Sequence, residues 1–170
     1  PGPAALPLPV LEQMQRELLD YQGTGMSILE ASHRGKAYEA AHAAAIHDLK
    51  ALVGAGDDWR VLFMGGGASA QFAMVPLNLL PSGSFAQYVT TGSWSEAALK
   101  EGKKLGDVRE AWSSGPEHRR VPNAGEVQVD PKARYLHYTS NNTIYGTQYA
   151  SAPIFAGTGN GAGEVPLIAD

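Results

Sequence analysis

The feature that most constrains the fold is an alternation of short β-rich runs with helical runs, which extends from Trp59 to the last residue. Strands that alternate with helices of about a dozen residues are typical of a parallel sheet with crossover helices. Strands are expected over residues 60–64, 85–91, 107–112, 134–139 and 165–169. Helices are expected between the first three of them, over 69–80 and 93–105. The sequence therefore predicts an α/β fold with a mostly parallel sheet. Its last strand, 165–169, is expected to be buried, and the polar stretch 113–131 to be a surface excursion.

The N-terminal third is expected to hold an arm and two helices. Four prolines in residues 1–9 predict an extended arm, because proline lacks an amide donor and disfavours helix in the residue before it. Apolar residues at helical spacing predict one helix over 10–21, stopped by Gly23, and a longer one over 38–52. Residues 27–30 resemble a capping box.

Charge and composition exclude several classes of function. A net charge of -4 provides no general attraction for nucleic acid or for an anionic membrane. The absence of cysteine excludes disulfides, thiolate catalysis and zinc held by sulfur, and it fits a cytoplasmic location. No apolar run approaches the roughly 18 residues of a membrane span. No metal site is predicted, because His42 and His47 are five residues apart and share a helix face poorly.

Gly65, Gly66 and Gly67 join a predicted strand to a predicted helix. Backbone N–H groups at such a helix start can surround a phosphate, and Ser69 could add a hydroxyl donor. Tight turns between strand and helix also need glycine for geometry alone. Phosphate binding and simple turn geometry therefore both stay open at this position.

Three other side chains are candidates for ligand binding, each with a plainer alternative. Trp94 follows a predicted strand and Gly92, so its ring could stack on a planar ligand or lie in the core. Asp170 ends an apolar strand, where an unpaired carboxylate loses solvation; it could face a cationic ring nitrogen or cap a following helix. Arg34 could bind a carboxylate or phosphate, or be an ordinary surface residue.

Taken together, these motifs resemble the phosphoserine aminotransferase family, a class-V branch of the fold-type-I enzymes that depend on pyridoxal phosphate. The resemblance extends along essentially the whole chain. It rests on a Gly-Pro-Ala-Ala-Leu-Pro run at residues 2–7 and on five ordered matches at 32–36, 66–72, 92–94, 137–138 with 142–144, and 169–170. It implies a three-layer α/β/α large domain that is truncated here. Residues 1–22 would form the N-terminal arm and first helix, and 23–170 the N-terminal portion of the cofactor-binding large domain.

The resemblance also implies a cofactor, pyridoxal 5'-phosphate (PLP), and a role for each matching residue. Ala68 and Ser69 match the pair that binds the cofactor phosphate. Trp94 matches the residue that stacks on the pyridine ring, Thr143 one that hydrogen-bonds within the cofactor site, and Asp170 the carboxylate that faces the pyridine nitrogen.

For the substrate, Arg34 matches the arginine that holds a carboxylate, and His33 lies beside it. The implied reaction transfers an amino group between L-glutamate and 3-phosphohydroxypyruvate, giving phosphoserine for serine biosynthesis, with pyridoxine biosynthesis as a further role. The family also implies a homodimer with shared active sites, without nucleic-acid or membrane partners.

The departure from the family lies at the end of the chain. The Schiff-base lysine of the family lies beyond the strand that ends at Asp170, and none of the six lysines here matches it. We therefore expect no catalytic lysine in this chain, a fragment of a longer enzyme, and no activity from these residues alone. Two alternatives stay open: an aminotransferase for another small acidic substrate, and an inactive module with the same fold.

Overall fold

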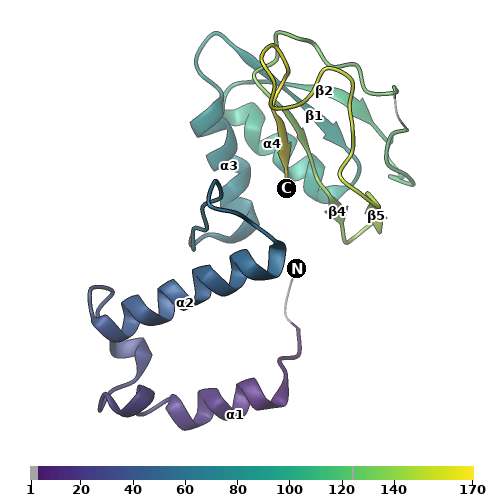
Figure 1. Ribbon diagram of the computed structural model, residues 1–170. Helices are drawn as coiled ribbons and strands as arrows, with labels where there is room; N and C mark the ends of the chain where they lie inside the picture. Colours follow the sequence, from purple (N-terminus) through teal and green to yellow (C-terminus); the bar gives the residue numbers. More distant parts are fainter. Residues whose placement is uncertain (1–3, 124) are drawn as a thin grey trace. The chain divides into compact units, whose positions relative to one another are not determined.

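The computed structural model describes residues 4–123 and 125–170. The chain divides into two compact units, Pro1–Phe63 and Met64–Asp170, which Figure 1 traces from purple to yellow. The first three residues of the predicted arm lie outside the described part. The boundary predicted after residue 22 stays a prediction.

In its described residues, the first unit is helical, with two α-helices and two short 3-10 helices. These are α1 (Leu8–Glu17), η1 (Tyr21–Gly23), η2 (Ile28–Glu30) and α2 (Lys36–Val53). The prediction that the arm extends through residue 9 is wrong, because α1 begins at Leu8. Pro9 lies in its first turn, where a missing amide proton leaves no helical hydrogen bond unmade.

The capping box and the long helix of this unit are confirmed. The Ser27 hydroxyl accepts a hydrogen bond from the Leu29 amide at 3.2 Å, and the Glu30 carboxylate accepts one from the Ser27 amide at 3.0 Å. Helix α2 ends at Gly54, whose φ of 66° is in the left-handed region that glycine adopts without strain. The first predicted helix is shorter than expected, since α1 ends at Glu17.

The strand predicted over residues 60–64 is wrong. The segment has no regular secondary structure, and no described strand pairs with it. A strand is held by hydrogen bonds to a neighbour, so a β-rich composition alone does not form one. The apolar side chains of Leu62, Phe63 and Met64 are correspondingly exposed, by 76%, 54% and 56%.

The second unit confirms the α/β fold with a parallel sheet. Its main elements are α3 (Gly67–Leu79), β1 (Phe85–Thr90), α4 (Ser93–Leu105), β2 (Asp107–Ser113), β3 (Leu136–Tyr138) and β6 (Leu167–Ala169). The four strands pair in parallel in the order β2-β1-β3-β6. A small antiparallel hairpin of β4 (Asn141–Asn142) and β5 (Thr147–Gln148), which was not predicted, follows β3.

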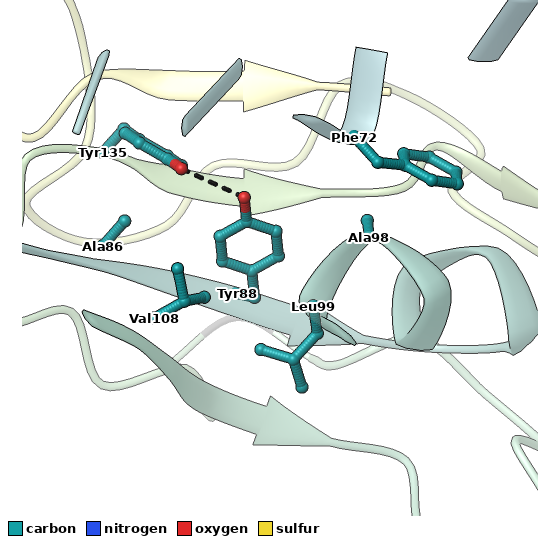
Figure 2. Packing of buried hydrophobic residues seen from close by; sticks show 7 residues of the cluster. All are labelled: Phe72, Ala86, Tyr88, Ala98, Leu99, Val108 and Tyr135. Atoms are coloured by element: carbon teal, nitrogen blue, oxygen red, sulfur yellow. Dashed lines mark hydrogen bonds between the residues drawn. The ribbon is translucent and has the colours of Figure 1, made fainter. Parts of the chain in front are cut away.

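Helices α3 and α4 pack on one face of this sheet. Figure 2 shows the buried cluster between them and the strands, which consists of Phe72, Ala86, Tyr88, Ala98, Leu99, Val108 and Tyr135. The hydroxyls of Tyr88 and Tyr135 lie 3.0 Å apart, so the buried polar ends of the two rings satisfy each other. Full burial of one large apolar side chain contributes about 1.5–3 kcal/mol, which makes this cluster a main source of stability.

Irregular segments cover the opposite face. A second cluster there joins strand residues to two loops and consists of Val89, Val127, Ala133, Leu136, Tyr138, Phe155 and Val165. The prediction that 113–131 is a surface excursion is therefore wrong for part of the segment. Its His118 is 2% exposed and lies between the Ser114 hydroxyl, at 2.6 Å, and the Glu96 carboxylate, at 3.0 Å.

The prediction of a buried last strand is also wrong. Strand β6 pairs with β3 on one side only, so it is an edge strand among the described residues. Leu167 and Ile168 are half-buried and Ala169 is exposed, whereas Val165, just before the strand, is 2% exposed. An apolar run therefore predicted the strand but not its place in the sheet.

Candidate functional site

The helix starts and the strand ends of the second unit share one edge of the sheet. Helix α4 begins at Ser93, three residues after β1 ends at Thr90. The other ends of α3 and α4 are also neighbours. Leu80, just after α3, lies against Gly106, just after α4: a Cβ built on Gly106 would be 2.7 Å from the Leu80 side chain. The two packed helices therefore point the same way and both begin at the carboxyl edge of the strands, where open α/β sheets bind ligands.

Trp94 and Thr143 meet directly at this edge. The indole Nε1 of Trp94 donates to the Thr143 hydroxyl at 2.9 Å, although the two residues are 49 apart in sequence. Trp94 is 40% exposed, so the alternative of a core tryptophan is wrong. Because the Thr143 oxygen accepts here, its own O–H hydrogen is left to donate elsewhere. A planar face and a hydroxyl donor thus lie side by side.

Asp170 follows β6 at the same edge. Its amide donates to the carbonyl of Tyr138 at 3.0 Å, and its own carbonyl accepts from the Ser140 amide at 2.7 Å. The Thr139 hydroxyl donates to its carboxylate across 3.4 Å. Burial raises the pKa of the Asp170 carboxyl above its usual range, and the hydrogen bond from Thr139 opposes that shift. A cationic group beside this carboxylate would favour its charged form and so oppose the effect of burial.

Ala68 and Ser69 lie in the first turn of α3. The N-cap residue, Gly66, has a φ of 92°, and a Cβ at this position would lie 2.6 Å from the Cβ of Ala70, so this turn requires glycine. The first amides of a helix have no acceptor within it, and residues 65–69 are exposed. The helix start is therefore accessible to an anion, and phosphate binding there stays a prediction.

His33 and Arg34 belong to the first unit and precede α2. The Arg34 amide donates to the Ser32 hydroxyl at 3.3 Å, and its guanidinium Nε donates to His33 Nε2 at 3.5 Å. Both side chains are exposed, which leaves most of the guanidinium donors available to a ligand. Their approach to the residues of the second unit stays a prediction.

The structure thus brings Trp94 and Thr143 into contact and places Asp170 and the start of α3 at the same edge of the sheet. Sequence reasoning assigned no role to Asn142 or Thr139, which bond to these residues. Within the described ranges, no group of three acidic or histidine side chains could hold a metal ion. None of the helices in the same ranges is long and apolar enough to cross a membrane.

Comparison with known proteins decides the family. The sequence model for aminotransferase class V matches residues 1–157 of the 170. This chain belongs to the class-V aminotransferase family. That membership accounts for the order of the motifs along the chain and for the parallel sheet with its helix starts at one edge.

Relatives within the class-V aminotransferase family are similar along the whole chain. This chain is 51% identical to the phosphoserine aminotransferase of Desulfosudis oleivorans over 100% of the chain's own length. It is 52% identical to that of Geobacillus kaustophilus over 89% of its own length. These matches cover 45% and 42% of the two relatives. The chain therefore spans less than half the length of the curated relatives that it matches.

Solved structures agree with this assignment. The phosphoserine aminotransferase of Bacillus circulans subsp. alkalophilus superposes with a TM-score of 0.89 at 51% identity, over 99% of this chain and 45% of that one. A PLP-bound phosphoserine aminotransferase from Trichomonas vaginalis gives a TM-score of 0.85 at 31% identity, over 98% and 45% of the two chains. The α/β fold with a mostly parallel sheet that the resemblance predicted is confirmed.

Proposed function

We propose that this chain is the N-terminal portion of a PLP-dependent phosphoserine aminotransferase, which exchanges an amino group between L-glutamate and 3-phosphohydroxypyruvate. The observation that carries the proposal is an identity of about half with proteins named phosphoserine aminotransferase, along 99–100% of the chain. The geometry at the carboxyl edge of the sheet supports the same activity, since it offers the chemistry that this cofactor needs.

The residues at this edge of the sheet offer chemical groups that suit PLP. The amides at the start of α3, with Ser69, would hold the phosphate, and the exposed face of Trp94 would lie against the ring. Thr143 would donate its O–H to a cofactor oxygen. A protonated ring nitrogen beside Asp170 would favour the charged carboxylate and so oppose the rise in pKa that burial causes. Bound PLP supplies an electron sink for the substrate Cα.

The substrate would be held by Arg34, with His33 beside it. A guanidinium binds a carboxylate through two parallel hydrogen bonds, which orients the substrate as well as attracting it. The lysine that completes the chemistry in this family would come from sequence after Asp170, so the activity belongs to the intact enzyme. We further propose a cytoplasmic homodimer, with residues 1–22 as its arm and first helix and 23–170 as part of the cofactor-binding domain.

The direct test is an amino-transfer assay on the intact purified protein with L-glutamate as donor. With 3-phosphohydroxypyruvate as acceptor, we expect phosphoserine and 2-oxoglutarate in equal amounts. A clear preference for oxaloacetate over 3-phosphohydroxypyruvate would instead support another acidic substrate. PLP binding without turnover of either acid would support an inactive module. The isolated 170-residue chain is expected to show no turnover.

Replacing Arg34 by alanine in the intact enzyme is expected to raise the apparent KM for glutamate or phosphoserine by about 10- to 100-fold, since hydrogen bonds to charged groups contribute about 1.5–3 kcal/mol. The PLP content, measured from its absorbance, should not change, because the guanidinium would contact substrate rather than cofactor. Arg16→Ala, an exposed arginine of α1, is the control. Unchanged kinetics in Arg34→Ala would refute the assignment.

A further inference from the structure

Two amides in the first turn of helix α4 are capped by a side chain from another segment of the chain. The residue at its N-cap position is Gly92, which has no side chain to accept hydrogen bonds from the first turn. The Asn142 side chain takes that role from 50 residues further along the chain. Its Oδ1 accepts from the amide of Trp94 at 3.1 Å and from the amide of Ser95 at 3.2 Å. These are the second and third amides of the helix, which a local N-cap side chain normally satisfies.

Gly92 makes the room that this arrangement needs. Its φ of 165° is extended and open to any residue, so backbone strain does not explain the glycine. A Cβ on Gly92, however, would lie 2.5 Å from both Cβ and Cγ of Asn142. The space that a local capping side chain would occupy is therefore filled by the Asn142 side chain itself.

The other end of the Asn142 amide is held as well. Its Nδ2 donates to the Thr91 hydroxyl at 2.9 Å, and the Thr147 hydroxyl, on the other strand of the hairpin, donates to the Thr91 carbonyl. Asn142 is fully buried, with an exposed fraction of 0%. A buried amide whose oxygen and nitrogen both have partners favours one geometry, because a shift would leave a polar group without its partner.

This connection fixes the position of Trp94 at two points. Asn142 holds its backbone amide, and the next residue, Thr143, accepts from its indole at 2.9 Å. The hairpin β4–β5 and the start of α4 therefore form one hydrogen-bonded unit. The plane of the exposed indole is set by this unit rather than by packing in the core.

We propose that Asn142 is a positioning residue, which caps α4 across the sheet edge and thereby holds the Trp94 ring and the Thr143 hydroxyl in the orientation that receives the cofactor. The inference about cofactor binding rests on the proposed function. The capping of α4 by Asn142 does not depend on the proposed function, so the capping and the link to the cofactor can be tested separately.

The test compares three variants of the intact enzyme with the wild type. Asn142→Leu keeps the approximate volume and removes the acceptor and donor. Asn142→Asp keeps an oxygen acceptor for both helix amides and adds a negative charge at a helix N-terminus, which the helix dipole favours. Asn78→Leu makes the same change at an exposed position of α3. The measurements are amide hydrogen exchange at Trp94 and Ser95 and the dissociation constant for added PLP.

In the wild type, we expect the Trp94 and Ser95 amides to be protected. In Asn142→Leu, their protection should fall by about tenfold or more, because two buried donors lose their acceptor. The dissociation constant for PLP should rise by about tenfold or more with it. Asn142→Asp should restore the protection and the PLP affinity to within about threefold of wild type, and the control should match wild type.

Several results would overturn the inference. Fast exchange of the Trp94 and Ser95 amides in the wild type would by itself overturn the inference. This result needs no variant, so it decides the question even if Asn142→Leu fails to fold. If Asn142→Leu loses amide protection but keeps its PLP affinity, Asn142 has no link to the cofactor. If Asn142→Asp restores neither the protection nor the PLP affinity, the role of Asn142 as a hydrogen-bond acceptor is excluded. If the wild-type enzyme binds no PLP, the proposed function fails, while the exchange data still decide whether Asn142 caps the helix.

Discussion

Replacing Asp170 by asparagine in the intact enzyme is expected to lower kcat by about 10²- to 10⁴-fold. Breaking a partly buried charge pair costs about 3–5 kcal/mol, and each 1.36 kcal/mol is a factor of ten in rate. In the proposed site, the carboxylate would favour a protonated ring nitrogen, and bound PLP would then supply a better electron sink for the substrate Cα. Because this interaction strengthens toward the transition state, PLP affinity should change far less than kcat, by about tenfold or less.

The measurement is a single-turnover reaction of the PLP-loaded enzyme with glutamate, followed by the cofactor absorbance, together with a separate titration of PLP. Asp107→Asn is the matched control. This exposed carboxylate is at the first residue of β2, so it lies at the amino ends of the strands, away from Asp170, and it pairs with Arg109. A variant at Asp170 that loses PLP but keeps wild-type turnover when saturated would contradict the assigned role. Equal losses in the control would indicate a general effect of removing a carboxylate.

Local sequence signals predicted those elements of the fold whose cause is local. Helix α4 lies over 93–105 as expected, because its apolar spacing and flanking glycines belong to the segment itself. The strand expected over 60–64 failed for the opposite reason, since a strand needs a neighbour that composition does not specify. The burial predicted for β6 failed in the same way, because its place at the edge of the sheet depends on pairing order.

The candidate site was predictable to the extent that it depends on residue type and order. Trp94, Thr143 and Asp170 follow strands or begin a helix, and parallel topology alone brings such positions to one edge. The role of Asn142 was not predictable, because its hydrogen bonds reach residues 47 to 51 positions away. The visible signal was an asparagine beside Thr143 and a glycine where a capping side chain is usual. Neither has meaning until β4 and the start of α4 are placed side by side.

His137 occupies the centre of β3 and gives the protein a specific dependence on pH. Its ring is 1% exposed and stacks on Tyr88 with centroids 4.5 Å apart, and its Nδ1 has no hydrogen-bond partner among the described residues. Burial lowers the pKa of His137 from 6.5 to about 4. The folded protein therefore keeps this imidazole neutral where the unfolded chain protonates it.

The sign of the effect follows from the direction of that shift. Between pH 6.5 and about 4, the unfolded state binds a proton that the folded state does not, so the free energy of unfolding falls as the pH falls through this window. A shift of this size corresponds to a loss of about 3 kcal/mol, since one pKa unit is about 1.4 kcal/mol. Little of this loss is expected above pH 7, where His137 is neutral in both states.

His137→Phe is expected to remove this contribution. Phenylalanine keeps an aromatic ring against Tyr88 and cannot be protonated, so the free energy of unfolding should fall less steeply between pH 7 and pH 4.5 than in the wild type. Urea denaturation of both proteins at several pH values measures the difference. His47→Gln removes an exposed histidine of α2 and should keep the wild-type slope. Parallel curves for wild type and His137→Phe would mean that the ring is protonated inside the fold, although its Nδ1 has no hydrogen-bond partner among the described residues.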